Sequence, residues 1–342
     1  DEAQRRITGS ATITYTNRSP DTLRYIWLQL DQNRFAKGSA ARLSEAAANP
    51  GSIADKEERD ILTYRKLAQS QSYADNVHGH EIESVTDARG RDLPYTIVDT
   101  MMRIDLPTPL RPGQRSAISI AWAFNIIDHT AIGGRNGFDH FEDSDTYIFF
   151  LAQWFPRLVA YTDYAGWQHQ QFLGRGEFTL EFGDYDVAIT VPEDHIVSST
   201  GELQNAGDVL TSEQRRRLRQ ARNAESPMYI VTPEEALANE KDKASGMRTW
   251  RFTAENVRDF AWASSRKFIW DAMVHKQQGA RYPEVLAMSF YPNEAMPIWS
   301  MYSTEAVAHT MEVYSRFSFD YPYPTAQSVN TWLGGGMEYP MI

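Results

Sequence analysis

The sequence contains no cysteine, which excludes disulfide bonds, thiolate nucleophiles and cysteine-ligated zinc sites within its 342 residues. Long hydrophobic runs are missing as well. No stretch approaches the roughly 18 to 20 consecutive apolar residues that a membrane-spanning helix needs. The first residues, Asp1 to Arg6, also lack the apolar region of a signal peptide. We therefore expect no transmembrane segment in this sequence.

Positive charge is in deficit. Against 45 Asp and Glu there are 34 Lys and Arg, which gives a formal net charge of -11. A protein that binds a phosphate backbone needs a basic face, so we expect no nucleic-acid partner. With 42% hydrophobic and 23% charged residues, the composition is that of a globular protein. The length is about twice that of a typical domain of roughly 100 to 200 residues, which favours two domains.

Residues 1–265 are dominated by a period of two, which is typical of half-buried β-strands. The first alternating run is followed by a turn signal and a second apolar run, Leu23 to Leu30, and this order predicts an antiparallel pair. We thus expect a β-rich N-terminal domain over residues 1–265. The alternating apolar positions are Ile7 to Tyr15, Met102 to Leu106, Ile118 to Ile126, Phe178 to Phe182 and Tyr185 to Val191.

Two charged segments interrupt this β pattern. Residues 53–71 have the spacing of an amphipathic surface helix. Thr211 to Gln214 fits a capping box and predicts the start of a second helix, whose arginines we interpret as a solvated face.

Helical spacing appears after residue 265. Val307, Met311, Tyr314 and Phe317 predict a helix of about four turns, which must end before the prolines that begin at Pro322. Residues 328–333 then read as a short strand, which leads into three glycines at 334–336. Because the chain stops shortly afterwards, at Ile342, we expect further sequence to follow.

Several motifs fail the spacing tests of known sites. The string from His78 to Ser84 has no second histidine four residues after His80, as the metallopeptidase signature H-E-x-x-H requires. The acidic stretch from Asp139 to Asp145 lacks the glycine and the terminal glutamate of an EF-hand loop, so a solvated loop is favoured. No nucleophile elbow, Walker loop or dinucleotide-binding glycine motif is present.

The glycines at 334–336 permit a different interpretation. Without side chains, they let another backbone approach a strand edge, as a peptide ligand would. Glu338 would then place a carboxylate at the end of that edge, where it could hold a free ammonium group. The alternative is a glycine bulge beside a surface glutamate. The residues alone favour neither.

Gly335-Gly336-Met337-Glu338 resembles the G-x-M-E-N motif of the aminopeptidase N-like zinc metallopeptidases. The preceding helix and Phe319 to Pro324 are similar to the segment that comes before this motif in that family. Further upstream, residues 153–157 followed by Asp163 resemble its R-x-x-F-P-C-x-D segment. The likeness extends over nearly the whole chain, but its specific part is residues 317–340.

The resemblance implies a mainly β fold with α: an N-terminal antiparallel β-sandwich or saddle domain, residues 1–265, followed by the beginning of a thermolysin-like α+β catalytic domain, residues 266–342. It also implies a zinc cofactor held by H-E-x-x-H and a later glutamate. None of these is in the sequence, so we expect the zinc ligands beyond Ile342. The complete protein would be a zinc metallo-aminopeptidase with the rest of the catalytic domain in cis, whereas this chain alone would be inactive.

The resemblance carries over to substrate-binding residues only, and it assigns no catalytic residue and no metal ligand to this chain. Glu338 matches the glutamate that binds the α-amino group of a peptide with a free N-terminus. Gly335, Gly336 and Met337 match positions along the peptide, and Gln153 matches a second amine-binding residue. Tyr339 departs from the pattern, because the family has Asn there. Family habit and an N-terminus that looks processed favour the periplasm or the cell exterior, with the cytoplasm left open.

An alternative function comes from another class. A non-catalytic β-sandwich module could bind peptide or glycan through aromatic surface, since 12% of the residues are aromatic and nine are tryptophan. A sequence that continues into H-E-x-x-H would decide for the peptidase.

Overall fold

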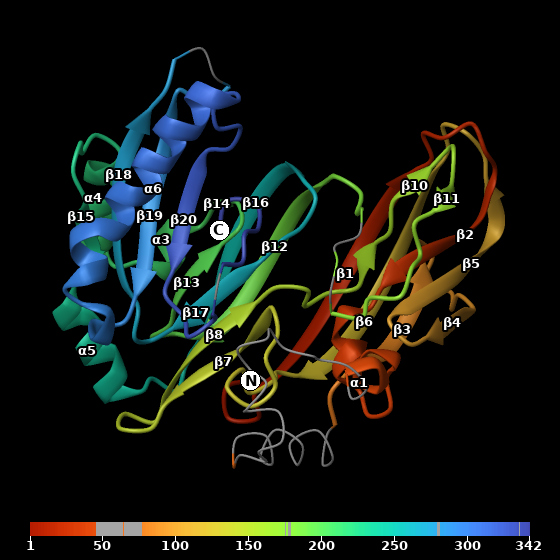
Figure 1. The fold of residues 1–342 in the computed structure, drawn as a ribbon, viewed down its shortest axis with the longest axis horizontal. Helices are drawn as coiled ribbons and strands as arrows, with labels where there is room; N and C mark the ends of the chain where they lie inside the picture. Colours follow the sequence, from red (N-terminus) through yellow and green to blue (C-terminus); the bar gives the residue numbers. More distant parts are fainter. Residues whose placement is uncertain (46–63, 65–76, 175, 177–178, 279–280, 335) are drawn as a thin grey trace, which may run out of the picture. The chain divides into compact units, whose positions relative to one another are not determined.

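The computed structural model describes residues 1–342 except 46–63, 65–76, 175, 177–178, 279–280 and 335. The chain forms two compact units, which Figure 1 shows as ribbons. The first unit comprises residues 1–136 and 153–181, and the second comprises residues 137–152 and 182–342. Both are rich in strands, as the sequence predicts.

The first unit contains two antiparallel sheets, in the orders β1-β6-β3 and β4-β5-β2-β9, and a small hairpin of β10 and β11. Its elements are β1 (Arg6–Thr16), β2 (Leu23–Gln29), η1 (Asp31–Phe35), α1 (Ala40–Glu45), β3 (Glu81–Asp87), β4 (Tyr95–Val98), β5 (Met101–Leu110), β6 (Arg115–Asn125), β9 (Arg157–Leu158), β10 (Tyr161–Thr162) and β11 (Gly166–Trp167).

The period of two explains the core of this unit. In β6, Ile118, Ile120, Trp122 and Phe124 are all buried, so alternate residues face the interior. Gly9 of β1 lies directly against Trp122, since a Cβ at this position would approach the indole ring to 2.6 Å. Strand β1 needs a glycine here because the large ring occupies the space of a side chain.

The second unit contains three sheets, in the orders β12-β16-β14, β13-β17-β8-β7 and β15-β18-β19-β20. Its elements are β7 (Asn136–Phe141), β8 (Thr146–Leu151), β12 (Gly183–Pro192), β13 (Ile196–Ser199), β14 (Glu202–Leu203), α3 (Ala206–Val209), α4 (Ser212–Ala221), β15 (Met228–Val231), α5 (Pro233–Asp242), β16 (Met247–Val257), β17 (Trp262–Ser265), β18 (Ile269–Lys276), β19 (Glu284–Tyr291), η3 (Asn293–Ala295), α6 (Ile298–Phe317) and β20 (Thr325–Val329).

Strands β19 and β20 are parallel and are connected through helix α6. Parallel neighbours require such a crossover, and α6 covers one face of the sheet (Figure 1). Ala308 and Met311 of α6 pack against Val285 and Ala287 of β19 and Ala326 of β20. This small apolar cluster fixes the helix on the sheet.

Several predicted elements are confirmed. Helix α4 begins after Thr211, and both hydrogen bonds of the capping box are present: Gln214 N donates to Thr211 Oγ1, and Thr211 N donates to Gln214 Oε1. Helix α6 ends at Phe317, before the prolines. It begins at Ile298 and is therefore longer than the predicted four turns.

Other predictions are wrong. β1 and β2 do not pair with each other, because β1 pairs with β6 and β2 with β5 and β9. Residues 178–182 form no strand in their described part; Leu180 makes only an isolated bridge to Val159. The strand predicted at 328–333 is β20 and begins at Thr325, directly after the last proline.

The stretch from Asp139 to Asp145 is only partly a solvated loop. Asp139 is fully buried in β7, and its Oδ2 accepts a hydrogen bond from Trp332 N. Asp145 lies in the turn before β8 and is exposed.

The structure does not decide two further predictions. Apart from Tyr64, the helix predicted at 53–71 lies outside the described residues. The boundary predicted at residue 265 falls inside the second unit, where β15 precedes it and pairs with β18, which follows it. It stays a prediction about domain organisation.

Candidate functional site: a cavity beside strand β20

The register of the β15-β18-β19-β20 sheet aligns three polar residues in one row. Asp271 of β18 lies opposite Ser289 of β19, and Ser289 lies opposite Ser328 of β20. Side chains alternate between the faces of a sheet, so all three point to the face that α6 covers. Ser303 and Thr304 of α6 complete a polar group in an otherwise apolar interface.

The buried end of this group is Asp271, which is 2% exposed. Its two carboxyl oxygens accept hydrogen bonds from the hydroxyls of Thr304 and Tyr291. Burial raises the pKa of Asp271 above its ordinary value, although these two hydrogen bonds act in the opposite direction. The pKa of Tyr291 is also raised, first by burial and then by the nearby Asp271.

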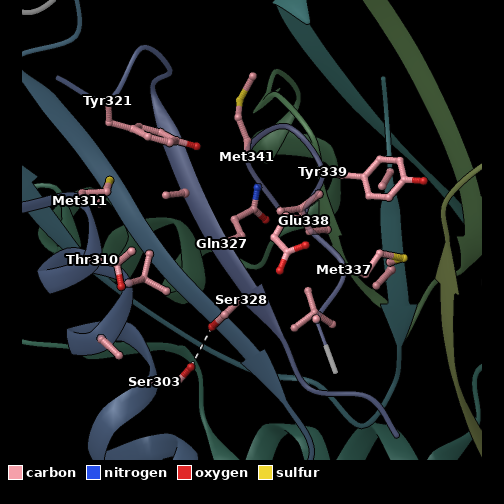
Figure 2. A pocket seen from close by; sticks show the side chains of 18 of the residues that line it. Ser303, Thr310, Met311, Tyr321, Gln327, Ser328, Met337, Glu338, Tyr339 and Met341 are labelled. Carbon is pink, nitrogen blue, oxygen red and sulfur yellow. Dashed lines mark hydrogen bonds between the residues drawn. The ribbon is translucent and has the colours of Figure 1, made fainter. Parts of the chain in front are cut away.

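The other end of the group opens into a cavity of about 770 Å³ within the second unit. Its walls are formed by α6, β20 and the residues after β20, together with residues of β8 and β17 (Figure 2). Ser303 and Ser328 line it, and so do the exposed aromatic residues Tyr314 and Phe319. The cavity has the size of ligand pockets for small molecules or short peptides.

The segment after β20 turns back and closes one side of this cavity. Thr200 Oγ1 donates a hydrogen bond of 2.8 Å to the carbonyl oxygen of Pro340, and the side chain of Met341 is buried. Met341 has a φ of 68°, and the main chains of Tyr339 and Ile342 exchange two hydrogen bonds. This tight turn positions Glu338, which precedes it, on the cavity.

Glu338 projects into the cavity, as Figure 2 shows, and its side chain is exposed. Among the described residues that line the cavity, it is the single charged side chain. The salt bridges of the described part of the chain do not include it. Its Oε1 lies against Gly336, where a Cβ would approach it to 2.5 Å. A glycine at 336 therefore leaves this carboxylate room to lie close to the main chain.

Strand β20 is the last strand in its sheet, and its outer edge borders the cavity. Leu286 N donates to Pro324 O, and Asn330 N donates to Phe290 O, which directs the main chains of Ala326 and Ser328 toward β19. The main-chain groups of Gln327 and Val329 face the other way, and no strand of the described chain pairs with them. The edge can thus accept another extended chain.

Gln327 keeps this edge in place. Its side-chain Nε2 donates to Ser199 O at 2.7 Å, and its Oε1 accepts from Ser198 Oγ at 2.8 Å. Both ends of the amide are bonded to β13. The outer edge of β20 is therefore held by side-chain hydrogen bonds to a neighbouring sheet, whereas its inner edge is held by main-chain pairing with β19.

The described residues do not provide a metal site. They contain no group of three or more His, Asp or Glu side chains arranged to hold an ion. His78 Nδ1 instead donates a hydrogen bond to Asn125 O, and burial lowers the pKa of His80 to about 3. A zinc ion therefore does not fit the residues present here. In the described chain, no helix is both long and apolar enough to cross a membrane.

The predicted site residues fall into two places. Gly336, Met337 and Glu338 line the cavity together, while Gly335 lies outside the described residues. Gln153 belongs to the first unit, where it is buried and its carbonyl oxygen accepts a hydrogen bond from Gln32. The sequence reasoning missed Asp271, Ser289, Ser303 and Ser328. For Asp271, Ser289 and Ser328, the only signal in the sequence was a polar residue at an inward-facing position of an apolar strand.

Comparison of the sequence with protein-family models and with curated proteins finds no match. Solved structures share the fold. An M1 zinc metallopeptidase from Deinococcus radiodurans is 12% identical with a TM-score of 0.50, over 96% of this chain and 52% of that chain. A mutant of it bound to a Tyr-Ser-Ala substrate gives the same identity and TM-score, with 53% of that chain covered.

A mutant of a two-domain M1 zinc metallopeptidase bound to L-tryptophan is 13% identical, again with a TM-score of 0.50 and coverages of 96% and 53%. The chain thus spans about half the length of the solved structures it matches. The fold of this chain is similar to that of the covered part of these M1 zinc metallopeptidases.

Proposed function

We propose that this chain is the substrate-recognising, N-terminal part of a zinc-dependent aminopeptidase of the M1 type. The observation that carries the proposal is Glu338, the single charged side chain among the described residues that line a largely apolar cavity. An acidic group in such surroundings favours a cationic ligand group, and the free α-ammonium of a peptide is one.

The open edge of β20 supports a peptide as the ligand. Gln327 and Val329 line the same cavity as Glu338, and their outward-facing main-chain donors and acceptors are not paired with any strand of the described residues. An extended peptide could add to this edge as a further strand, with its amino end at Glu338. Gly336 adds no side chain that would obstruct such a backbone.

The zinc ion of such an enzyme would require ligands from outside the described residues, because these contain no suitable cluster. We accordingly assign binding and orientation to this chain, and no step of hydrolysis. The remainder of the catalytic domain would be present in cis in the complete protein. Gln153 remains our candidate for a second amine-binding residue.

Isothermal titration calorimetry with a tripeptide tests this proposal. We expect the Glu338→Gln variant to bind Phe-Ala-Ala about 10- to 100-fold more weakly, because a hydrogen bond to a charged group contributes roughly 1.5–3 kcal/mol. N-acetylated Phe-Ala-Ala, which has no ammonium, should bind weakly to both proteins.

Glu305→Gln is the matched control, since Glu305 is an exposed glutamate on α6 that does not line this cavity. It should leave the affinity for the free tripeptide unchanged. Equal binding of Phe-Ala-Ala by the wild type and the Glu338→Gln variant would refute the assignment. The alternative, a module that binds peptide or glycan without catalysis, is not favoured by the solved structures of similar fold, which are peptidases.

A further inference from the structure

Three serine hydroxyls form a closed ring at the floor of the cavity. Ser289 Oγ donates to Ser303 Oγ at 2.9 Å, Ser303 Oγ and Ser328 Oγ lie 2.7 Å apart, and Ser328 Oγ and Ser289 Oγ lie 2.9 Å apart. The contact between Ser303 and Ser328 is drawn in Figure 2. Helix α6 supplies one of these residues, and β19 and β20 supply the other two.

Counting protons shows what the ring offers to a ligand. Three hydroxyls have three protons, and the ring has three contacts, so each proton is used inside the ring. With Ser289 as donor to Ser303, the remaining bonds run from Ser303 to Ser328 and from Ser328 to Ser289. Each hydroxyl oxygen can accept twice, so Ser303 and Ser328 each keep one free acceptor position.

The third serine has no such capacity. Ser289 is fully buried and thus out of reach of a ligand, and its oxygen also lies 2.6 Å from the oxygen of Thr304, whose single hydroxyl proton is donated to Asp271. The ring is thus closed on its buried side, while Ser303 and Ser328, both partly exposed, line the cavity.

We propose that Ser303 and Ser328 form a hydrogen-bond-accepting subsite for the free ammonium group of a bound peptide, in the cavity that Glu338 lines. A primary ammonium carries three N–H donors, and a single carboxylate oxygen cannot accept all three. Neutral hydroxyl acceptors complement it without adding a second charge to the cavity. The identity of the ligand rests on the proposed function. The acceptor character of the subsite rests on the serine ring alone.

The test measures the affinity for Phe-Ala-Ala of Ser303→Ala, Ser328→Ala and the double variant by isothermal titration calorimetry. Each single variant should bind about three- to tenfold more weakly, as expected for one neutral hydrogen bond. Ser300→Ala is the matched control, because Ser300 lies on the same helix, is partly exposed, does not line the cavity and donates its hydroxyl to Pro297 O. It should bind like the wild type.

A second ligand separates a binding role from a structural one. The tripeptide whose amino group is replaced by hydrogen, 3-phenylpropanoyl-Ala-Ala, has the same shape and keeps both amide N–H groups, but it lacks the ammonium donors. The serine variants should bind it as the wild type does, whereas a distorted cavity would weaken both ligands equally. Thermal unfolding of each variant verifies that it folds.

The outcomes also distinguish this inference from the proposed function. If Glu338→Gln weakens binding of Phe-Ala-Ala and the serine variants do not, the subsite is wrong and the proposed function stands. If the serine variants weaken binding and Glu338→Gln does not, the subsite stands without an ammonium site at Glu338. Unchanged affinity in all variants overturns both.

Discussion

Each of the two units buries an aspartate, and the two carboxyl groups are stabilised in different ways. Asp31 of the first unit, fully buried, accepts hydrogen bonds from Arg157 Nε at 2.8 Å and Nη2 at 2.7 Å, and a third from Gln29 Nε2. Asp271 of the second unit is bonded to two hydroxyls, those of Thr304 and Tyr291. The first is an ion pair, and the second is a hydroxyl network.

The difference shows two solutions to the cost of burying a carboxyl group. A bidentate guanidinium compensates the charge itself, so it fixes β9 to the residues after β2. Hydroxyls compensate only the hydrogen-bonding capacity, which leaves the pKa of Asp271 raised by burial. The hydroxyl network around Asp271 also continues through Ser289 to the cavity, whereas an isolated ion pair would end at its two partners.

The largest effect is expected from breaking the ion pair. Arg157→Leu should lower the free energy of unfolding by about 3–5 kcal/mol, because it leaves a buried carboxylate without its cation. Urea unfolding measures this. Arg91→Leu is the control, since Arg91 is exposed in its pair with Asp87 and should cost at most about 1 kcal/mol. Equal losses in the two variants would show that the burial of Asp31 is not decisive.

An intermediate effect is expected from removing one hydroxyl from the network. Tyr291→Phe should cost about 1–3 kcal/mol, because one oxygen of Asp271 loses its donor in a buried site. Tyr323→Phe removes a hydroxyl that bonds to Asn256 O near the surface and should cost less than about 0.5 kcal/mol. A loss of less than 0.5 kcal/mol for Tyr291→Phe would contradict the network as a stabilising feature.

The smallest effect is a pH dependence that belongs to Asp271. Since its pKa in the folded protein is raised, the stability it contributes is complete below the pKa of an unfolded aspartate, about 3.9. This contribution is lost as the pH rises through the raised folded value. Urea unfolding above about pH 4 should therefore show a decline that is absent in Asp271→Asn. The same decline in both proteins would assign it to other groups.

The sequence was informative where one local rule decided the structure. Alternation predicted β1, β5, β6 and β12, and the capping box predicted the start of α4. It was less so for α6, where helical spacing suggested Tyr314 and Phe317 as core residues. Both are exposed, at 69% and 87%. The residues that face the sheet are Thr304, Ala308 and Met311, and the predicted spacing contained only Met311 of these three.

Part of the candidate site was also visible in the sequence. The glycines before Glu338 permitted a strand edge with an acidic group near a peptide, with a glycine bulge as the alternative, and Gly336 and Glu338 line one cavity. The pairing partners of the strands were not visible, because a period of two specifies which face is buried but not which strand lies alongside. The antiparallel pair predicted for β1 and β2 failed for this reason.

The sequence by itself determined the strand-rich character of the chain, the position of α6 before the prolines, and the motif at residues 335–338. These depend on neighbours within a few residues. The tertiary structure alone decided that Asp271, Ser289 and Ser328 form one row under α6, since this requires the register of three strands. It also decided that this row ends in the cavity of Glu338, because hydrogen bonds such as that from Thr200 to Pro340 join segments 140 residues apart.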